Sequence, residues 1–261
     1  MPRVSVVICC ANAADTLPAA CASAAWADEL LIVDSGSTDA TPEIARAHAD
    51  RYLVEPWRGY SAQKAFAAQQ AANDWVFVLD ADEEISPDLA AAIQQLDDAA
   101  LAKLDVAYMR RRHYLMGLPV RAWSPDYQSR FIHRQRVRWS DDALHENRLP
   151  SDKSRTLRLP GCILHKRTSN AGFSDYFSGR RMDERLMMVA EQMYDRGKRA
   201  RWVDLALRPW FAFVKSYVFK LGCLDGAFGY MVAQKSAWST QLKYAALWAV
   251  QRRRDAERQE H

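Results

Sequence analysis

Two stretches in the first half of the chain decide its fold: Leu30-Leu31-Ile32-Val33-Asp34-Ser35-Gly36-Ser37-Thr38-Asp39 and Trp75-Val76-Phe77-Val78-Leu79-Asp80-Ala81-Asp82-Glu83. Each begins with a continuous apolar run of strand length and ends in carboxylates. Such runs are typical of strands that are buried on both faces, as in a parallel sheet covered by helices. The carboxyl ends of parallel strands meet at one edge of the sheet, where such folds bind ligands. We therefore expect Asp34, Asp80 and Asp82 to lie at one ligand-binding edge.

The segments around these stretches fit the same fold. Residues 4–10 form a third apolar, β-branched run, and residues 15–25 and 61–72 have helical patterns. Thr41 and Ser86 are each followed by proline, which is typical of an N-cap and the first helical position. The sequence therefore predicts an α/β fold with a mostly parallel sheet and helices on both faces.

The pattern changes along the rest of the chain. Residues 106–109 and 130–133 read as strands, inside a region that runs to about residue 166 and is rich in arginine, histidine, tryptophan and proline. From residue 174 onward the chain reads as helical, with amphipathic helices at 202–217 and 241–251. We predict a catalytic domain at residues 1–170 and a helical extension at residues 171–261.

Composition excludes several classes of protein. The 261 residues are 49% apolar and 26% charged, so the chain is neither wholly disordered nor fibrous. The net charge of +4 is too small to indicate a nucleic-acid partner, and we expect none. The five cysteines lack metal-ligand spacing and fit the reduced thiols of a cytoplasmic protein. We find neither a signal-peptide pattern nor an apolar run of about 18 residues, so we expect no spanning helix.

The second acidic stretch indicates a metal. Asp80 and Asp82 are two residues apart and point to the same side of an extended strand end. Hard oxygen ligands suit a divalent cation, Mg²⁺ or Mn²⁺, held jointly by protein and substrate phosphates. The chain has neither Gly-x-x-x-x-Gly-Lys nor Gly-x-Gly-x-x-Gly, which disfavours a P-loop kinase and a dinucleotide-dependent oxidoreductase.

With both acidic motifs in place, the sequence resembles the family 2 inverting glycosyltransferases, which have the GT-A fold. Further segments resemble the branch that includes lipopolysaccharide core β-glucosyltransferases: Trp26-Ala27-Asp28-Glu29, Pro56-Trp57-Arg58-Gly59-Tyr60, Pro125-Asp126-Tyr127-Gln128, His145-Glu146 and Leu224-Asp225-Gly226. The resemblance covers nearly the whole chain. It implies a nucleotide-sugar half at residues 1–100 and an acceptor half at residues 101–170.

The resemblance also implies roles for individual residues. Asp34 contacts the nucleotide base, Asp80 binds the ribose and the metal-diphosphate, and Asp82 is the direct metal ligand. Lys64 assists the diphosphate, unless it is simply a surface lysine. The full set expected to bind the nucleotide is Asn12, Asp34, Ser35, Gly36, Lys64 and Asp80.

Inversion is a single displacement and needs one general base near the acceptor hydroxyl. The candidate carboxylates are Asp126, Asp141, Asp142 and Glu146. We favour Glu146, with Asp126 as the second candidate for the base or as an acceptor-binding residue. His145 and His165 are candidates for a further metal ligand, although a lone histidine is more often structural.

Two departures from the family pattern leave the donor open. The family has Asn-Glu after the first strand, and here the pair is Asn12-Ala13. The branch has lysine before that asparagine, and here it is Ala11. A carboxylate and a cation are therefore missing from the rim of the nucleotide pocket.

Two further patterns bear on partners. The middle region carries a dense set of cations that suits an anionic acceptor or a solvated face: Arg110, Arg111, Arg112, His113, Arg121, Arg130, Arg134, Arg136 and Arg138. In the helical extension, residues 202–219 interleave aromatic residues with arginine and lysine. That mixture is typical of a membrane interface, and the alternative is a helical cap that packs on the sheet or on another subunit.

Together these features predict an enzyme that transfers a hexose with inversion, most favourably from UDP-glucose, to a lipid-linked saccharide acceptor of the lipopolysaccharide core. We expect it at the cytoplasmic face of the inner membrane. A metal-dependent nucleotidyltransferase is one alternative, although residues 10–14 lack the glycine-rich basic loop it usually needs. A non-catalytic membrane-surface adaptor is the other. The sequence leaves the oligomeric state open.

Overall fold

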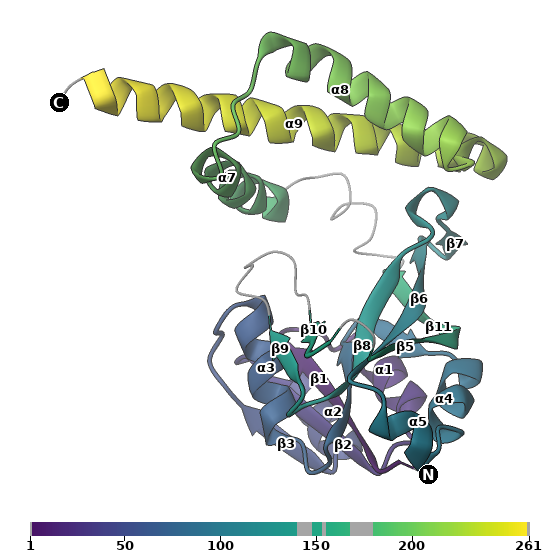
Figure 1. Cartoon of the computed structure of the whole chain (residues 1–261). Helices are drawn as coiled ribbons and strands as arrows, with labels where there is room; N and C mark the ends of the chain where they lie inside the picture. The colour runs from purple at the N-terminus through teal and green to yellow at the C-terminus, as the bar shows by residue number, and fades with distance from the viewer. Residues whose placement is uncertain (1, 140–147, 153–154, 168–179, 260–261) are drawn as a thin grey trace. The chain divides into compact units, whose positions relative to one another are not determined.

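The computed structural model describes residues 2–139, 148–152, 155–167 and 180–259 (Figure 1). The chain divides into two compact units. One comprises Met1–Tyr114 and Pro125–Thr168, and the other comprises Leu115–Ser124 and Ser169–His261. The second unit therefore takes in a segment from inside the range that the sequence assigns to the acceptor half.

The first unit is built on a mixed sheet in the order β3-β2-β1-β4-β8-β6-β11-β5. Its strands are β1 Val4–Cys10, β2 Glu29–Asp34, β3 Arg51–Val54, β4 Trp75–Asp80, β5 Glu83–Ile85, β6 Val106–Leu115, β8 Tyr127–His133 and β11 Thr156–Arg167. Strands β3, β2, β1 and β4 are parallel, as predicted. Beyond β4 the pairing changes, because β8 runs antiparallel to both β4 and β6, and β11 runs antiparallel to β5. The two short strands β9 Val137–Trp139 and β10 Arg148–Pro150 pair separately.

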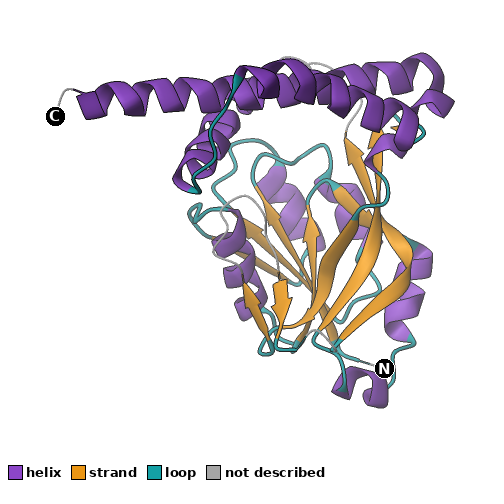
Figure 2. Cartoon of the chain, turned by 45° about the horizontal axis from the view of Figure 1, so that its top comes forward, coloured by secondary structure: helices purple, strands orange, loops and turns teal. Residues whose placement is uncertain are grey.

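Helices cover both faces of this sheet, which confirms the predicted fold class (Figure 2). They are α1 Leu17–Ser23, α2 Thr41–His48, α3 Tyr60–Gln70, α4 Pro87–Gln94 and α5 Asp98–Ala102. Side-chain alternation along β1 explains why the run is apolar throughout: Val6 and Ile8 enter the core under α1, α2 and α4, whereas Val7 enters the core under α3.

One predicted cap is correct and one is wrong. The hydroxyl of Ser86 accepts a hydrogen bond from the amide of Leu89 and caps α4, as expected. Thr41 is instead the first residue of α2, and Ala40 occupies the cap position. The hydroxyl of Thr41 is already engaged, because it accepts a hydrogen bond of 2.7 Å from the amide of Ala13.

The second unit is helical in its larger segment. It contains α7 Arg180–Asp195, α8 Trp202–Val214, a π-helical turn Lys215–Phe219, a 3₁₀ turn Gly222–Asp225 and α9 Gly226–Gln259. The smaller segment adds β7 Leu118–Pro119 and a 3₁₀ turn Arg121–Trp123. Within this unit α8 lies along α9, and α7 packs on α9 through the buried residues Ala190, Leu247 and Val250 (Figure 1).

The motif Leu224-Asp225-Gly226 joins the two segments of this unit. Asp225 accepts a hydrogen bond of 2.7 Å from Nε of Arg121, and Gly226 has a φ of +60°, which suits glycine.

Among the described residues, no helix has the length and apolarity needed to cross a bilayer.

Candidate active site

The carboxyl ends of β1 and β2 bring four of the predicted nucleotide-binding residues together. Asn12 follows β1, whereas Asp34 ends β2 and leads into Ser35 and Gly36. The Asn12 side chain accepts a hydrogen bond of 2.8 Å from the amide of Thr38. These contacts order the loop over residues 35–39 at the sheet edge.

Asp34 is buried and already bonded within the protein. One of its oxygens accepts a hydrogen bond of 2.5 Å from the hydroxyl of Ser37, and the other accepts one of 2.8 Å from the phenol of Tyr52. Burial and this bond to Asp34 raise the pKa of Tyr52 to about 12. Asp34 thus holds the loop in place, a use that the sequence did not indicate.

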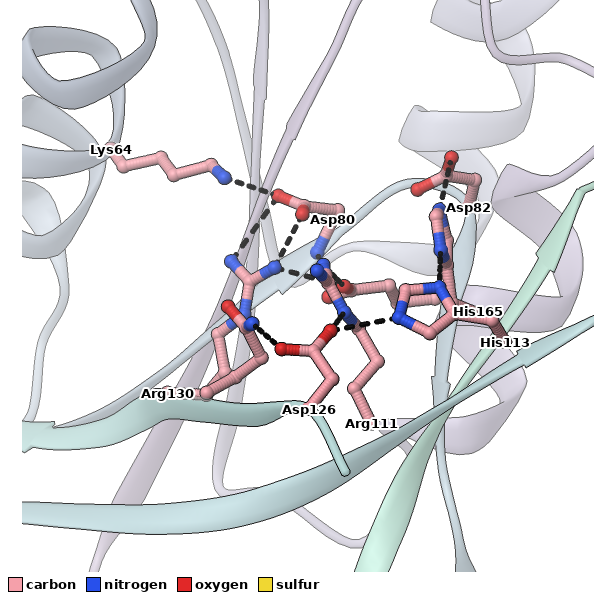
Figure 3. A network of polar contacts seen from close by, with 10 residues as sticks. Lys64, Asp80, Asp82, Arg111, His113, Asp126, Arg130 and His165 are labelled. Carbon is pink, nitrogen blue, oxygen red and sulfur yellow. Dashed lines mark hydrogen bonds and ion pairs between the residues drawn. The ribbon is translucent and has the colours of Figure 1, made fainter. Parts of the chain in front are cut away.

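Asp80, at the end of β4, lies between two cations (Figure 3). Its oxygens are 2.5 Å from Nζ of Lys64 and 2.5 Å from Nη2 of Arg130. Burial alone would raise the pKa of Asp80, but Arg130 and Lys64 outweigh it and hold that pKa well below its usual value. Lys64 is only 8% exposed, so the surface-lysine alternative does not describe it.

Glu83 connects this cluster to the next strand. It is fully buried, and its Oε1 accepts hydrogen bonds of 2.8 Å from Arg130 and 2.9 Å from Arg111. Its other oxygen accepts a bond of 3.2 Å from the amide of Asp80. Glu83 was not among the predicted site residues, although its place in the second acidic stretch could have indicated it.

A chain of polar contacts runs from Asp82 to Asp126 (Figure 3). Nε2 of His165 is 3.1 Å from Asp82, and Nδ1 of His165 is 2.9 Å from Nδ1 of His113. Nε2 of His113 is 2.8 Å from Asp126. The Asp82 side chain is 44% exposed, whereas both histidines are buried. The predicted metal residues Asp82 and His165 are therefore brought together, and His113, which was predicted only as one of the cations for an acceptor, lies beside them.

Three side chains form hydrogen bonds with the carboxylate of Asp126. Besides His113, it accepts hydrogen bonds of 2.8 Å from Nε of Arg111 and 2.7 Å from the side-chain Nε2 of Gln128. Burial would raise the pKa of Asp126, but these bonds and the charge of Arg111 outweigh it, so the pKa lies well below its usual value. The other predicted base candidates, Asp141, Asp142 and Glu146, lie outside the described residues, as does His145.

The arginines of the middle region do not form a single patch. Arg111 and Arg130 enter the network above, and Arg121 binds Asp225 in the second unit. Arg134 pairs with Asp74, and Arg136 donates to the carbonyl groups of Leu101 and Leu104. Several of the cations assigned to an anionic acceptor therefore stabilise the protein itself.

Known proteins are similar to this chain in sequence and in fold. The family model described as glycosyl transferase family 2 matches residues 5–159. The lipopolysaccharide core biosynthesis glycosyltransferase LpsC of Rhizobium meliloti is 30% identical over 239 residues, which span 82% of this chain and 80% of that protein. An uncharacterised glycosyltransferase of Rickettsia typhi is 45% identical over 69 residues, 26% of this chain and 24% of that one.

A solved structure agrees on the fold. The mannosyltransferase of Pyrobaculum calidifontis, in complex with GDP-Man and Mn²⁺, aligns with a TM-score of 0.51 at 16% identity, over 95% of this chain and 86% of that one. The fold is therefore GT-A. The match to the family model and the extended similarity to LpsC together show that this chain belongs to glycosyl transferase family 2.

Proposed function

We propose that this protein transfers a hexose with inversion from a nucleotide sugar, UDP-glucose being the favoured donor, to a lipid-linked acceptor of the lipopolysaccharide core. One observation carries the proposal. Two carboxylates lie at the carboxyl end of β4. Asp80 is bound by Lys64 and Arg130, while Asp82 is half-exposed beside His165. This arrangement suits a diphosphate and its cation at one sheet edge. The similarity to LpsC supports the acceptor class.

Asp82 and His165 fit a divalent cation. One carboxylate oxygen and one imidazole nitrogen, 3.1 Å apart, form a donor pair that Mn²⁺ or Mg²⁺ accepts, with diphosphate oxygens and water as the remaining ligands. The cation would offset the negative charge that builds on the departing diphosphate. Asp80 is the weaker ligand candidate, since Arg130 and Lys64 already occupy its oxygens.

The fixed cations of the site have a separate role in the proposal. Lys64 and Arg130 are preorganised by Asp80 and lie at the edge where the diphosphate would bind. Positive groups held in place before the reaction stabilise charge without reorganising during it. They would therefore assist departure of the nucleoside diphosphate.

We assign the general base to Glu146. Asp126 is a poor base, because three hydrogen-bond donors surround its carboxylate and its pKa is strongly lowered. Asp126 instead serves to orient His113. The base would take the proton of the acceptor hydroxyl as the sugar is transferred.

Membrane contact is the second part of the proposal. Helix α8 and the turns that follow it carry large exposed apolar residues: Trp202, Val203, Leu207, Trp210, Phe211, Val218, Phe219, Leu221 and Leu224. Trp202 is 76% exposed, Trp210 66% and Phe219 72%. Contiguous exposed apolar surface on a soluble monomer usually marks a site of contact with a partner or a membrane. We call these nine residues the α8 face.

The charges beside the α8 face favour a lipid surface over a protein. Residues 201–224 hold the cations Arg201, Arg208, Lys215 and Lys220 and a single carboxylate, Asp204. Aromatic residues interleaved with cations suit the interface of an anionic membrane. Contact with the cytoplasmic leaflet of the inner membrane would bring the enzyme to its lipid-linked acceptor.

Transfer from UDP-[¹⁴C]glucose to an inner-core acceptor tests the catalytic proposal. We expect Asp82→Asn to lower turnover by about 100-fold or more, because it removes a charged metal ligand. Glu84→Gln is the matched control, since Glu84 lies two residues away and pairs with the half-exposed Lys166. Released UDP indicates glycosyl transfer, whereas released glucose 1-phosphate would indicate transfer of the nucleotidyl group. Turnover of Asp82→Asn equal to that of the control would refute the assignment.

A further inference from the structure

A cavity of about 590 Å³ lies in the first unit, and none of the residues that line it belongs to the polar network. Side-chain alternation along β6 separates the two. Arg111 and His113 point into the network, whereas Arg110, Arg112 and Tyr114 line the cavity. Neighbouring strands complete its wall with Tyr127 of β8 and Arg158 of β11, and the start of α4 contributes Ser86 and Asp88.

The cavity is strongly cationic. Arg110, Arg112 and Arg158 are exposed, and none of them pairs with a carboxylate of the described residues. Asp88 is the one acidic side chain in the lining, so positive charge predominates. The arginines that enter the polar network are different in this respect, because each already binds aspartate or glutamate.

The lining also suits a sugar. The guanidinium of Arg158 lies over the ring of Tyr127 at 4.8 Å from its centroid, which holds both side chains at the cavity wall. Tyr114 and Tyr127 offer rings and hydroxyl groups, which pack against and hydrogen-bond to saccharides. A volume of this size is typical of a small-molecule site.

The spacing of the arginines indicates more than one anionic group. Arg110 and Arg112 are two residues apart on one strand, so their Cα atoms are separated by about 7 Å. A guanidinium binds a phosphate or carboxylate through two parallel hydrogen bonds. We propose that this cavity is a second ligand site, separate from the transfer site, which binds an acidic saccharide through its phosphate or carboxylate groups. The inference does not depend on the proposed transfer reaction.

Arginine footprinting tests the site directly. The whole protein is treated with phenylglyoxal without divalent cations, in the presence of fructose 1,6-bisphosphate or of fructose, and modified peptides are quantified by mass spectrometry. We expect the bisphosphate to slow modification of Arg110, Arg112 and Arg158 at least about fivefold, and fructose to have no effect. Arg138 is the internal control, since it is exposed on β9. Equal protection of Arg138, or no protection at all, would overturn the proposal.

Variants then measure the contribution of each arginine. Because a hydrogen bond to a charged group is lost, Arg112→Gln and Arg158→Gln should each weaken bisphosphate binding about tenfold, while Arg138→Gln leaves it unchanged. Unaltered affinity in both cavity variants would contradict the assignment. Thermal unfolding of each variant separates loss of binding from loss of the fold.

The ligand has two possible sources, which kinetics distinguish. If the acidic groups belong to the acceptor, Arg112→Gln raises the KM for a phosphorylated acceptor but not for the dephosphorylated one. If a free sugar phosphate is the ligand, adding it changes the rate of the wild-type enzyme with either acceptor. Both outcomes support a second site, and the footprint remains decisive even if no transfer is detected.

Discussion

At the scale of single residues, the contact between His113 and His165 limits which ring nitrogens carry protons and where a cation can bind. Burial lowers the pKa of His113 and so favours its neutral ring, whose Nε2–H tautomer pairs with the carboxylate of Asp126. Nδ1 of His113 is then an acceptor, and His165 must donate its own Nδ1–H to it. This tautomer of His165 presents the lone pair of Nε2 to the oxygen of Asp82, 3.1 Å away. Two acceptors in contact call for a cation between them.

This proton order assigns positioning roles to Asp126 and His113. Partners behind a metal-binding histidine fix its tautomer, and their loss typically weakens metal affinity 10- to 100-fold. We therefore expect His113→Phe to weaken Mn²⁺ binding in the presence of UDP by about that factor, as measured by calorimetry. His48→Gln removes an exposed histidine on α2 and should leave the affinity unchanged.

NMR of the His165 ring separates the positioning role of Asp126 and His113 from a merely structural one. With Mg²⁺ and UDP bound, the ¹⁵N shifts of the wild-type His165 ring should report the proton on Nδ1, and Asp126→Asn should disturb that preference. Two results would contradict this role: Mn²⁺ binding by His113→Phe within twofold of wild type, or a proton on Nε2 of His165 in the loaded enzyme. Either would show that Asp126 and His113 do not help His165 to hold the metal.

At the scale of elements, a strand can be predicted from the sequence when both of its faces are buried. Strands β1, β2 and β4 are continuous apolar runs because their two faces enter two cores, and all three were predicted. Strand β3 is half-exposed, and β11 contains Pro160, Gly161 and several cations, so neither has a strand signature. Both were missed.

The site was predictable to the same extent as the elements that carry it. Asp80 ends a strand that the sequence reveals, and Asp82 follows it in a turn rather than on the predicted extended strand end, so both lie at the sheet edge while their roles stay predictions. His113 and His165 meet across strands that are 52 residues apart in the chain, and no local pattern reports such a pairing. The signal that was present is alternation: Ala107 and Met109 are buried on one face of β6, which places Arg111 and His113 on that face too.

Gly161 sets how closely β11 approaches α4. A Cβ at this position would come within 2.4 Å of the backbone nitrogen of Leu89, and its φ of +82° already favours glycine. We expect Gly161→Ala to lower the free energy of unfolding by about 3–5 kcal/mol, since it combines overpacking with backbone strain.

The matched control for this substitution is Gly36→Ala. Gly36 has a similar φ of +87° but no atom within 4 Å of the added Cβ, so only the strain remains, about 1–2 kcal/mol. Urea unfolding of the two variants isolates the packing contribution. If both lose the same stability, close contact between β11 and α4 is not what requires glycine at position 161.

At the scale of the whole molecule, the two units carry different surfaces. The first holds the polar network, in which the charged groups around Asp80 and Glu83 largely neutralise one another. The second holds the α8 face, whose apolar residues are exposed while its neighbouring cations outnumber its one carboxylate. The proposed substrate chemistry and the proposed surface attachment lie in different units, so we expect that each can be removed by substitutions that leave the other intact.

Vesicle binding tests this separation. We expect the full chain to co-sediment with phosphatidylcholine vesicles that contain 30% phosphatidylglycerol, and less with pure phosphatidylcholine, because each cation near an anionic surface contributes about 1 kcal/mol. Trp210→Ser should weaken binding about tenfold or more, since a large aromatic side chain no longer enters the interface. Trp57→Ser is the control, because Trp57 is 53% exposed but lies in the first unit. Equal partitioning of the two variants would exclude α8 as the attachment surface, whereas selective loss in Trp210→Ser, with UDP binding retained, would place attachment there.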